Sequence, residues 1–70
     1  MSKLPVVSGL RLIKVLTKKG YIWKSSSGSH VTLVKNGNQP IIVTIPLHKE
    51  LKPGLLLAIL KHTGISKDEL

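Results

Sequence analysis

The sequence contains no cysteine and no phenylalanine, and its longest unbroken apolar run, Leu55 to Leu60, is short. Without cysteine, neither a disulfide framework nor a thiolate metal site can form, which fits a reducing cytoplasm as the expected location. The apolar run is far too short to cross a bilayer, and residues 1–8 lack the apolar stretch of a secretory signal. We therefore expect one soluble cytoplasmic domain over residues 1–70, with no membrane partner.

Acidic residues are also scarce, since only Glu50, Asp68 and Glu69 carry carboxylates. Nucleases that use two metal ions need clustered carboxylates, and the three histidines do not fall at the spacing of helical metal ligands. The serines lie at expected turns and caps, which argues against a Ser-His-Asp triad. We expect no metal and no cofactor, so any catalysis should be independent of metal ions.

What the chain has in excess is positive charge. Its 11 basic residues give a formal net charge of +8, and the isoelectric point is about 10.2. Such a surface suits a polyanionic partner, which is a nucleic acid, an anionic membrane or an acidic protein. Apolar residues make up 41% of the chain, so it should fold rather than remain a basic tail. Its length allows one small core shared by two layers.

The periodicity of apolar residues predicts the element order α-β-β-β-α. A helix over 9–19 follows a capping serine, Ser8, and strands follow over 21–25, 30–35 and 41–45. Turns are expected at 26–28 and 36–38. A second helix begins at Pro53, runs to about His62 and stops at Gly64, and residues 66–69 have the spacing of a capping box that opens a last helical turn. The predicted fold is α+β, a three-stranded antiparallel sheet with two helices on one face.

Alternation along the strands predicts which side chains the helices cover. In the first strand, the charge of Lys24 argues that it points outward, which sends Tyr21 and Trp23 inward. These two aromatic residues could stack on bases, but a place in the core is the more common one for lone aromatics in a chain without phenylalanine. The side chains expected to face the helices are Val31, Leu33, Ile41, Val43 and Ile45, and those expected to face outward are His30, Thr32, Val34, Ile42 and Thr44.

The segment Gly28-Ser29-His30 is the most informative one for function. It places an ionisable imidazole just past a turn, beside a strongly basic sheet, and an imidazole titrates near neutral pH. Such a group can deprotonate an RNA 2′-hydroxyl for attack on the adjacent phosphate, or protonate the leaving oxygen. The alternative is a surface or capping histidine without a catalytic role.

Lysines near the sheet could hold and neutralise RNA phosphates, or they could be ordinary solvated side chains. His48, in the loop after the third strand, could contact RNA, orient the backbone or have no role. His62 is expected to interact only with the C-terminal end of its helix. The residues that we expect to bind RNA are Lys14, Lys18, Lys24, Ser29, Lys35 and His48, with Lys19 as a further member of the basic surface.

The whole pattern resembles the HicA-type, or YcfA-like, toxins of bacterial and archaeal toxin–antitoxin systems, over roughly residues 9–69. The matching residues are Lys19-Gly20-Tyr21, Gly28-Ser29-His30, Ile45-Pro46 with His48, Lys52-Pro53-Gly54, Leu56, Ile59-Leu60 and Gly64-Ile65. The resemblance implies a single HicA-like toxin domain with a fold like that of double-stranded RNA-binding domains. It implies an endoribonuclease that cleaves mRNA and inhibits translation and growth, with His30 at the position of the family's essential histidine. The implied partner is a HicB-type antitoxin that blocks the RNA-facing site.

Leu55 and Leu57 depart from this family's usual polar or basic residues in the last helix. Helical spacing places Leu56, Ile59 and Leu60 on one buried stripe, with Leu55 and Leu57 on either side of it. We therefore expect Leu55 and Leu57 to contact a partner protein, either the antitoxin or a second copy in a weak homodimer. The alternative is that Leu57 packs against the first helix and only Leu55 is exposed.

Two other classes of function stay open on the residues alone. One is a non-catalytic RNA-binding module of the same topology, which would recognise duplex shape and phosphates. The other is a basic adaptor for an acidic protein or a membrane surface, and the chain has no separate amphipathic helix rich in tryptophan or phenylalanine to support it.

Overall fold

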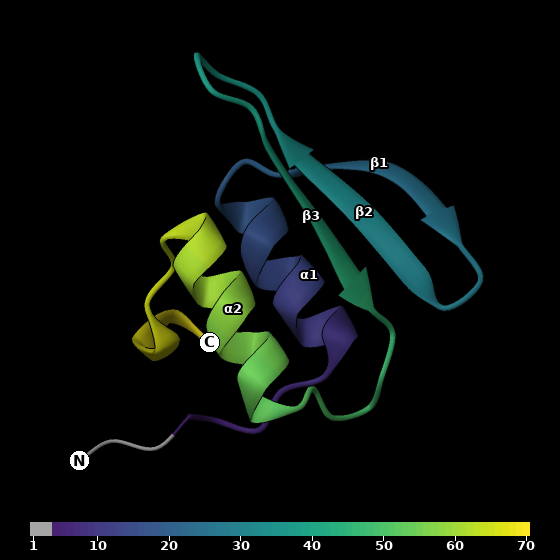
Figure 1. The fold of residues 1–70 in the computed structure, drawn as a ribbon, viewed down its shortest axis with the longest axis vertical. Helices are drawn as coiled ribbons and strands as arrows, with labels where there is room; N and C mark the ends of the chain where they lie inside the picture. The colour runs from purple at the N-terminus through teal and green to yellow at the C-terminus, as the bar shows by residue number, and fades with distance from the viewer. Residues whose placement is uncertain (1–3) are drawn as a thin grey trace.

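A computed structural model describes residues 4–70 and confirms the predicted element order, α-β-β-β-α (Figure 1). The three strands form one antiparallel sheet in the order β1-β2-β3. The order matches the small α+β fold expected from the sequence and is compatible with that of a double-stranded RNA-binding domain. The elements are α1 (Gly9–Lys18), β1 (Ile22–Ser27), β2 (His30–Lys35), β3 (Ile41–Pro46), α2 (Pro53–Thr63) and a short 3₁₀ helix, η1 (Lys67–Glu69).

The helix ends follow the capping signals in the sequence. The Ser8 hydroxyl accepts a hydrogen bond from the Arg11 backbone N–H at 3.0 Å, which satisfies one of the free donors at the start of α1. Pro53 occupies the first turn of α2. At η1, the hydroxyl of Ser66 and the carboxylate of Glu69 form the predicted capping box.

The core lies between the two helices and one face of the sheet. Val31 and Leu33 of β2 stand opposite Ile45 and Val43 of β3, and all four side chains are buried. Directly opposed residues of an antiparallel pair share a face, so this face is the one that the helices cover. The other face carries His30, Thr32 and Val34, opposite Pro46, Thr44 and Ile42. The predicted alternation of β2 and β3 is confirmed.

The prediction that Trp23 packs inward is wrong, whereas Tyr21 is buried as expected. Trp23 stands opposite the buried Leu33 and so lies on the helix side of the sheet, yet 54% of it is exposed. The reason is that the helices leave β1 uncovered: all of its residues are exposed, whereas both helices pack on β3, the other edge strand. The register of β1 also shifts between Trp23 and Ser25, so Lys24 occupies a bulge.

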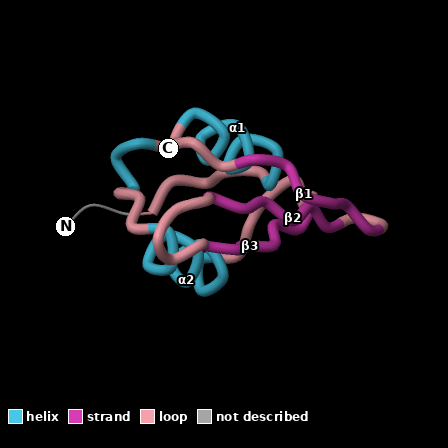
Figure 2. Tube along the Cα trace, turned by 90° about the horizontal axis from the view of Figure 1, so that it is seen from above, coloured by secondary structure: helices cyan, strands magenta, loops and turns pink. Residues whose placement is uncertain are grey.

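The first hairpin is longer and its turn tighter than the sequence predicted. Ser26 and Ser27 continue β1 instead of forming the turn, and Gly28 and Ser29 alone connect the strands. Gly28 has a φ of 58° and Ser29 lies outside the left-handed region, the pattern of a hairpin turn that requires glycine first. Figures 1 and 2 show this hairpin extending beyond the helices. Within residues 4–70, no helix is long and apolar enough to cross a membrane.

Candidate functional site

His30 lies at one end of the sheet, where the first hairpin turn meets the end of β3. It is the first residue of β2 and stands between Ser27 of β1 and Pro46 of β3. The backbone pairing continues past Pro46, because the N–H of Leu47 donates to the Ser29 carbonyl at 2.6 Å. The imidazole is therefore exposed to solvent but carried on a backbone that is hydrogen-bonded on both sides.

The first turn of α1 and His48 lie at the same end of the sheet. The N–H of Gly9 donates to the His48 carbonyl at 2.9 Å. Gly9 also packs directly on β3, since a Cβ at this position would overlap the carbonyl group of Pro46. Because Pro46 is the cross-strand partner of His30, these contacts bring three sequence-distant segments together. They are the hairpin turn with His30, the loop with His48 and the start of α1.

The predicted basic residues come from three elements, α1, β1 and β2. Lys14 and Lys18 are exposed on α1, and Lys24 occupies the bulge of the edge strand. Lys35 is the last residue of β2, about 17 Å along the strand from His30 at the usual rise per residue. Its ammonium group lies 5.8 Å from the centroid of the Tyr21 ring. Lys35 is thus at the opposite end of β2 from His30, and its side chain lies beside Gly20, directly after Lys19. RNA binding by Lys35 stays a prediction.

The Lys35 ammonium group packs against the ring of Tyr21. This ring is buried at the junction between α1 and β1, and burial raises the pKa of the Tyr21 hydroxyl above the usual value. The hydroxyl oxygen is buried without a hydrogen-bond partner in the described structure. The Tyr21–Lys35 pair therefore belongs to the packing of the far end of the sheet.

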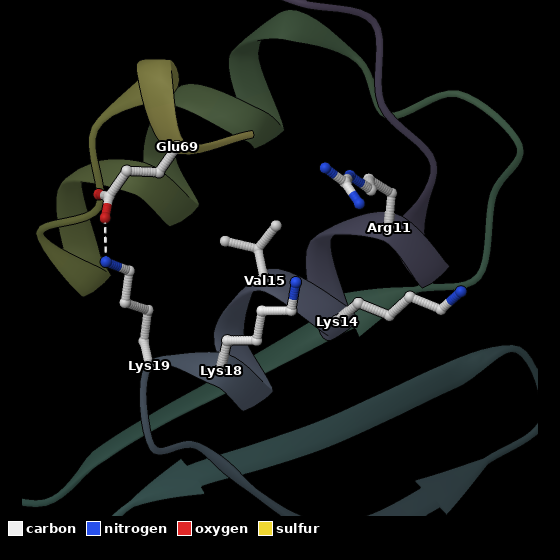
Figure 3. Close-up of a pocket in the computed structure, with 6 residues that line it drawn as sticks. All are labelled: Arg11, Lys14, Val15, Lys18, Lys19 and Glu69. Carbon is white, nitrogen blue, oxygen red and sulfur yellow. Dashed lines mark ion pairs between the residues drawn. The ribbon is translucent and has the colours of Figure 1, made fainter.

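Beside α1 lies a groove with a volume of about 230 Å³ (Figure 3). Lys14 and Lys18, both predicted to bind RNA, line it together with residues that were not among the predicted site residues, Arg11 and Glu69. Lys19 and Val15 complete its lining. The spacing of Arg11, Lys14 and Lys18 by three and four residues was a signal that they share one face of the helix. Nothing in the sequence indicated that Glu69, 50 residues after Lys19, would reach the groove.

Glu69 forms an ion pair with Lys19 across the groove. Its other carboxylate oxygen accepts a hydrogen bond from the Ser66 backbone N–H at 2.9 Å. The hydrogen bond from Lys19, followed by that from Ser66, holds the pKa of Glu69 below its usual value. The carboxylate is thus ionised at neutral pH, and it fixes the C-terminal turn against the end of α1.

The two leucines predicted to contact a partner are both exposed, Leu55 by 38% and Leu57 by 50%. The alternative, in which Leu57 packs away against α1, does not hold. Leu57 lines a second groove, of about 360 Å³, together with Leu60 and Ile65. Leu56, Ile59 and Leu60 are buried, as the helical spacing predicts. Contact with a partner stays a prediction.

The described part of the chain contains no group of three or more histidine, aspartate or glutamate side chains placed to hold a metal ion. His62, the third histidine, lies away from His30 and bonds through Nε2 to the Ile42 carbonyl at 3.0 Å. His62 therefore joins the end of α2 to β3. The sequence predicted only an interaction with the C-terminal end of its own helix.

A family model described as the HicA toxin of bacterial toxin–antitoxin systems matches residues 10–65. The chain belongs to the HicA toxin family. The matched region includes α1 from its second residue, all three strands and α2, and therefore the sheet end that carries His30 and His48. No curated protein and no solved structure matches the chain. Membership of this family identifies the chain as a toxin of a toxin–antitoxin pair, whose counterpart is an antitoxin.

Proposed function

We propose that this HicA-family chain is an endoribonuclease that cleaves mRNA, with His30 as a general acid or base. The observation that supports it most is the position of His30. Its imidazole is exposed at the end of the sheet, on a backbone fixed by both neighbouring strands, and next to the His48 loop and the start of α1. An exposed imidazole on a rigid strand can reach a large substrate while its own position stays defined.

The proposed reaction is an internal transfer at an RNA phosphate. The imidazole takes the proton of the 2′-hydroxyl, the 2′ oxygen forms a bond to phosphorus, and the bond from phosphorus to the 5′ oxygen breaks. The leaving 5′ oxygen receives a proton from an imidazolium or from water, so charge and atoms balance. Basic side chains on α1 bind other phosphates of the same RNA, and His48 contacts the RNA at the sheet end. No step requires a metal ion.

The proposal is tested by expressing the chain alone and by assaying the purified protein on mRNA. Growth should stop and mRNA should be cleaved, and His30→Ala should abolish both with unchanged circular dichroism. His48→Ala, at the same end of the sheet, serves as the comparison and should raise KM more than it lowers kcat. Cleavage should persist in EDTA. A folded His30→Ala protein that still cleaves, or cleavage that EDTA stops and magnesium restores, would contradict the mechanism.

The alternative is an RNA-binding module without catalysis, and the compatibility of the fold with double-stranded RNA-binding domains favours it specifically. The same assays separate the two functions. Wild-type protein that binds RNA in a salt-dependent manner but leaves it intact would support the binding module and contradict the ribonuclease.

We further propose that a HicB-like antitoxin neutralises the chain by covering the sheet end that carries His30, and that Leu55 and Leu57 contribute to its contact. The exposure of both leucines on α2 supports this, since two neighbouring exposed leucines in so small a domain are suited to a protein contact. A weak homodimer through the same leucines is the competing arrangement, and the molecular mass of the isolated chain in solution distinguishes it.

A further inference from the structure

The groove beside α1 has a charge that its surroundings do not neutralise. Four basic side chains line it, and a single carboxylate, Glu69, faces them. Of the four, only Lys19 has an ion-pair partner among the described residues. Like charges held close together on a helix repel one another and destabilise it, so an unneutralised row of basic side chains is suited to an anionic ligand.

The groove also has a direction. Arg11 lies in the first turn of α1, Lys14 in the next and Lys18 in the last, so basic side chains recur with every turn along a helix about 15 Å long. The first turn of α1 is the one fixed to the sheet end, through Gly9 and the His48 carbonyl. The groove therefore begins at the end of the sheet that carries His30 and finishes at Lys19 and Glu69.

We propose that this groove binds the phosphodiester backbone of the RNA, and that Glu69 is an internal carboxylate that competes with an RNA phosphate for Lys19. This inference rests on the proposed function and adds to it the path of the substrate. The carboxylate of Glu69 marks a position where an oxyanion is held by Lys19. A phosphate that replaces it gains Lys19 as a partner only when the ion pair opens.

The repetition of charge favours RNA over an acidic protein as the occupant. A single carboxylate of a partner protein needs one cation, whereas four cations along successive turns match a ligand whose charges repeat along a chain. The groove starts at the end of α1 that packs on the His30 end of the sheet, which supports the same choice. Because the imidazole lies on the sheet face that the helices leave uncovered, the RNA passes around this end of the sheet to reach it. The charge of Glu69 is present at neutral pH, so the competition operates under the conditions of the reaction.

The test measures RNA binding in the His30→Ala background, where the substrate stays intact. Fluorescence anisotropy of a labelled single-stranded mRNA fragment is recorded over a series of salt concentrations. The double variant Arg11→Gln with Lys18→Gln should bind more weakly, and the slope of log Kd against log salt should fall by about 0.7 for each phosphate that the protein no longer neutralises. The matched control, Lys52→Gln with Lys61→Gln, removes the same charge from exposed positions on α2 and its N-cap. Equal effects of the two double variants would overturn the groove as the binding site.

A separate pair of variants tests the role of Glu69. Glu69→Gln removes the charge but keeps an acceptor for the capping box, so the C-terminal turn should persist. It should increase RNA affinity roughly twofold to fivefold at low salt, and more than Asp68→Asn, which makes the same change of net charge on the neighbouring residue. An equal increase in the two variants would contradict direct competition for Lys19.

Two further outcomes separate this inference from the proposed function. If wild-type protein binds RNA through the groove but does not cleave it, the ribonuclease proposal fails and the groove stands. If the groove variants bind RNA as well as the parent does, but bind an acidic partner protein more weakly, the groove is a protein site and the inference is overturned.

Discussion

The replacement of Gly9 by alanine tests how the site is assembled. The φ of Gly9 is negative, so the backbone accepts alanine, and the obstacle is purely steric. The added Cβ would overlap the backbone carbonyl of Pro46 and come within 3.2 Å of the Cα of Leu47. A backbone carbonyl cannot rotate away as a flexible side chain can, so α1 must move from the end of β3.

The magnitude follows from two effects. Overpacking of a fixed contact costs about 1–3 kcal/mol. The movement of α1 also breaks the hydrogen bond from the Gly9 N–H to the His48 carbonyl, which contributes about 1 kcal/mol. We expect Gly9→Ala to lower the free energy of unfolding by about 2–4 kcal/mol. A domain of this size has only about 3.5–10 kcal/mol in total, so the decrease is a large fraction of its stability.

Gly54→Ala is the matched control. Gly54 also lies in the first turn of a helix and also has a negative φ, but nothing lies within 4 Å of an added Cβ. Alanine there should stabilise the domain by about 0.4–1 kcal/mol, because it restricts the unfolded chain. Urea unfolding followed by far-ultraviolet circular dichroism compares the two variants, with the m value as the check for a two-state transition. If Gly9→Ala is as stable as Gly54→Ala, the close packing of α1 on β3 does not exist in solution.

Three other predictions concern exposed side chains. Trp23 is the only tryptophan and is 54% exposed, so its fluorescence should be quenched when RNA stacks on β1; an unchanged spectrum at saturating RNA would place the RNA elsewhere. The pKa of Glu69 should lie below the usual 4.5 when its side chain is titrated by NMR, and Lys19→Gln should return the pKa toward that value. Because the pKa is lowered in the folded state, the ion pair adds stability at neutral pH. That stability is lost as the pH falls through the lowered pKa. Replacement of Leu55 and Leu57 by lysine should weaken binding of the antitoxin, or self-association, in a folded protein, whereas a decrease of more than about 3 kcal/mol in stability would show that they are core.

The helices and the strands β2 and β3 could be predicted because local signals and burial agree there. Ser8 and the Ser66–Glu69 capping box lie where the chain leaves an extended conformation, and alternation in β2 and β3 matches the buried face of the sheet. Trp23 could not be predicted in the same way. Alternation placed it on the correct side, but whether a side is covered depends on where the edge strand lies relative to the helices, which is a tertiary property.

The sequence indicated individual residues of the candidate site better than it indicated how they are arranged. His30 stood out because an imidazole followed a glycine turn, and the structure places it exposed at a strand end. The separation of Lys35 from His30 follows from the predicted strand itself, because residues 30 and 35 lie at opposite ends and on opposite faces of β2. The groove was missed because the carboxylate that closes it comes from the C-terminal turn, far from α1 in the sequence.

The contacts that join the proposed catalytic and phosphate-binding parts are made by the backbone. The loop after β3 is held at three points. The Leu47 N–H bonds to the Ser29 carbonyl, the His48 carbonyl to the Gly9 N–H, and the Leu51 N–H to the Val7 carbonyl at 2.9 Å. Backbone hydrogen bonds of this kind do not depend on side-chain identity, so no residue pattern reveals them. They nevertheless fix the distance between the His30 end of the sheet and the first turn of α1. The proposed chemistry requires an RNA held on α1 to pass around the sheet end and reach an imidazole on the uncovered face of β2, so the geometry of this loop matters to it as much as the side chains do.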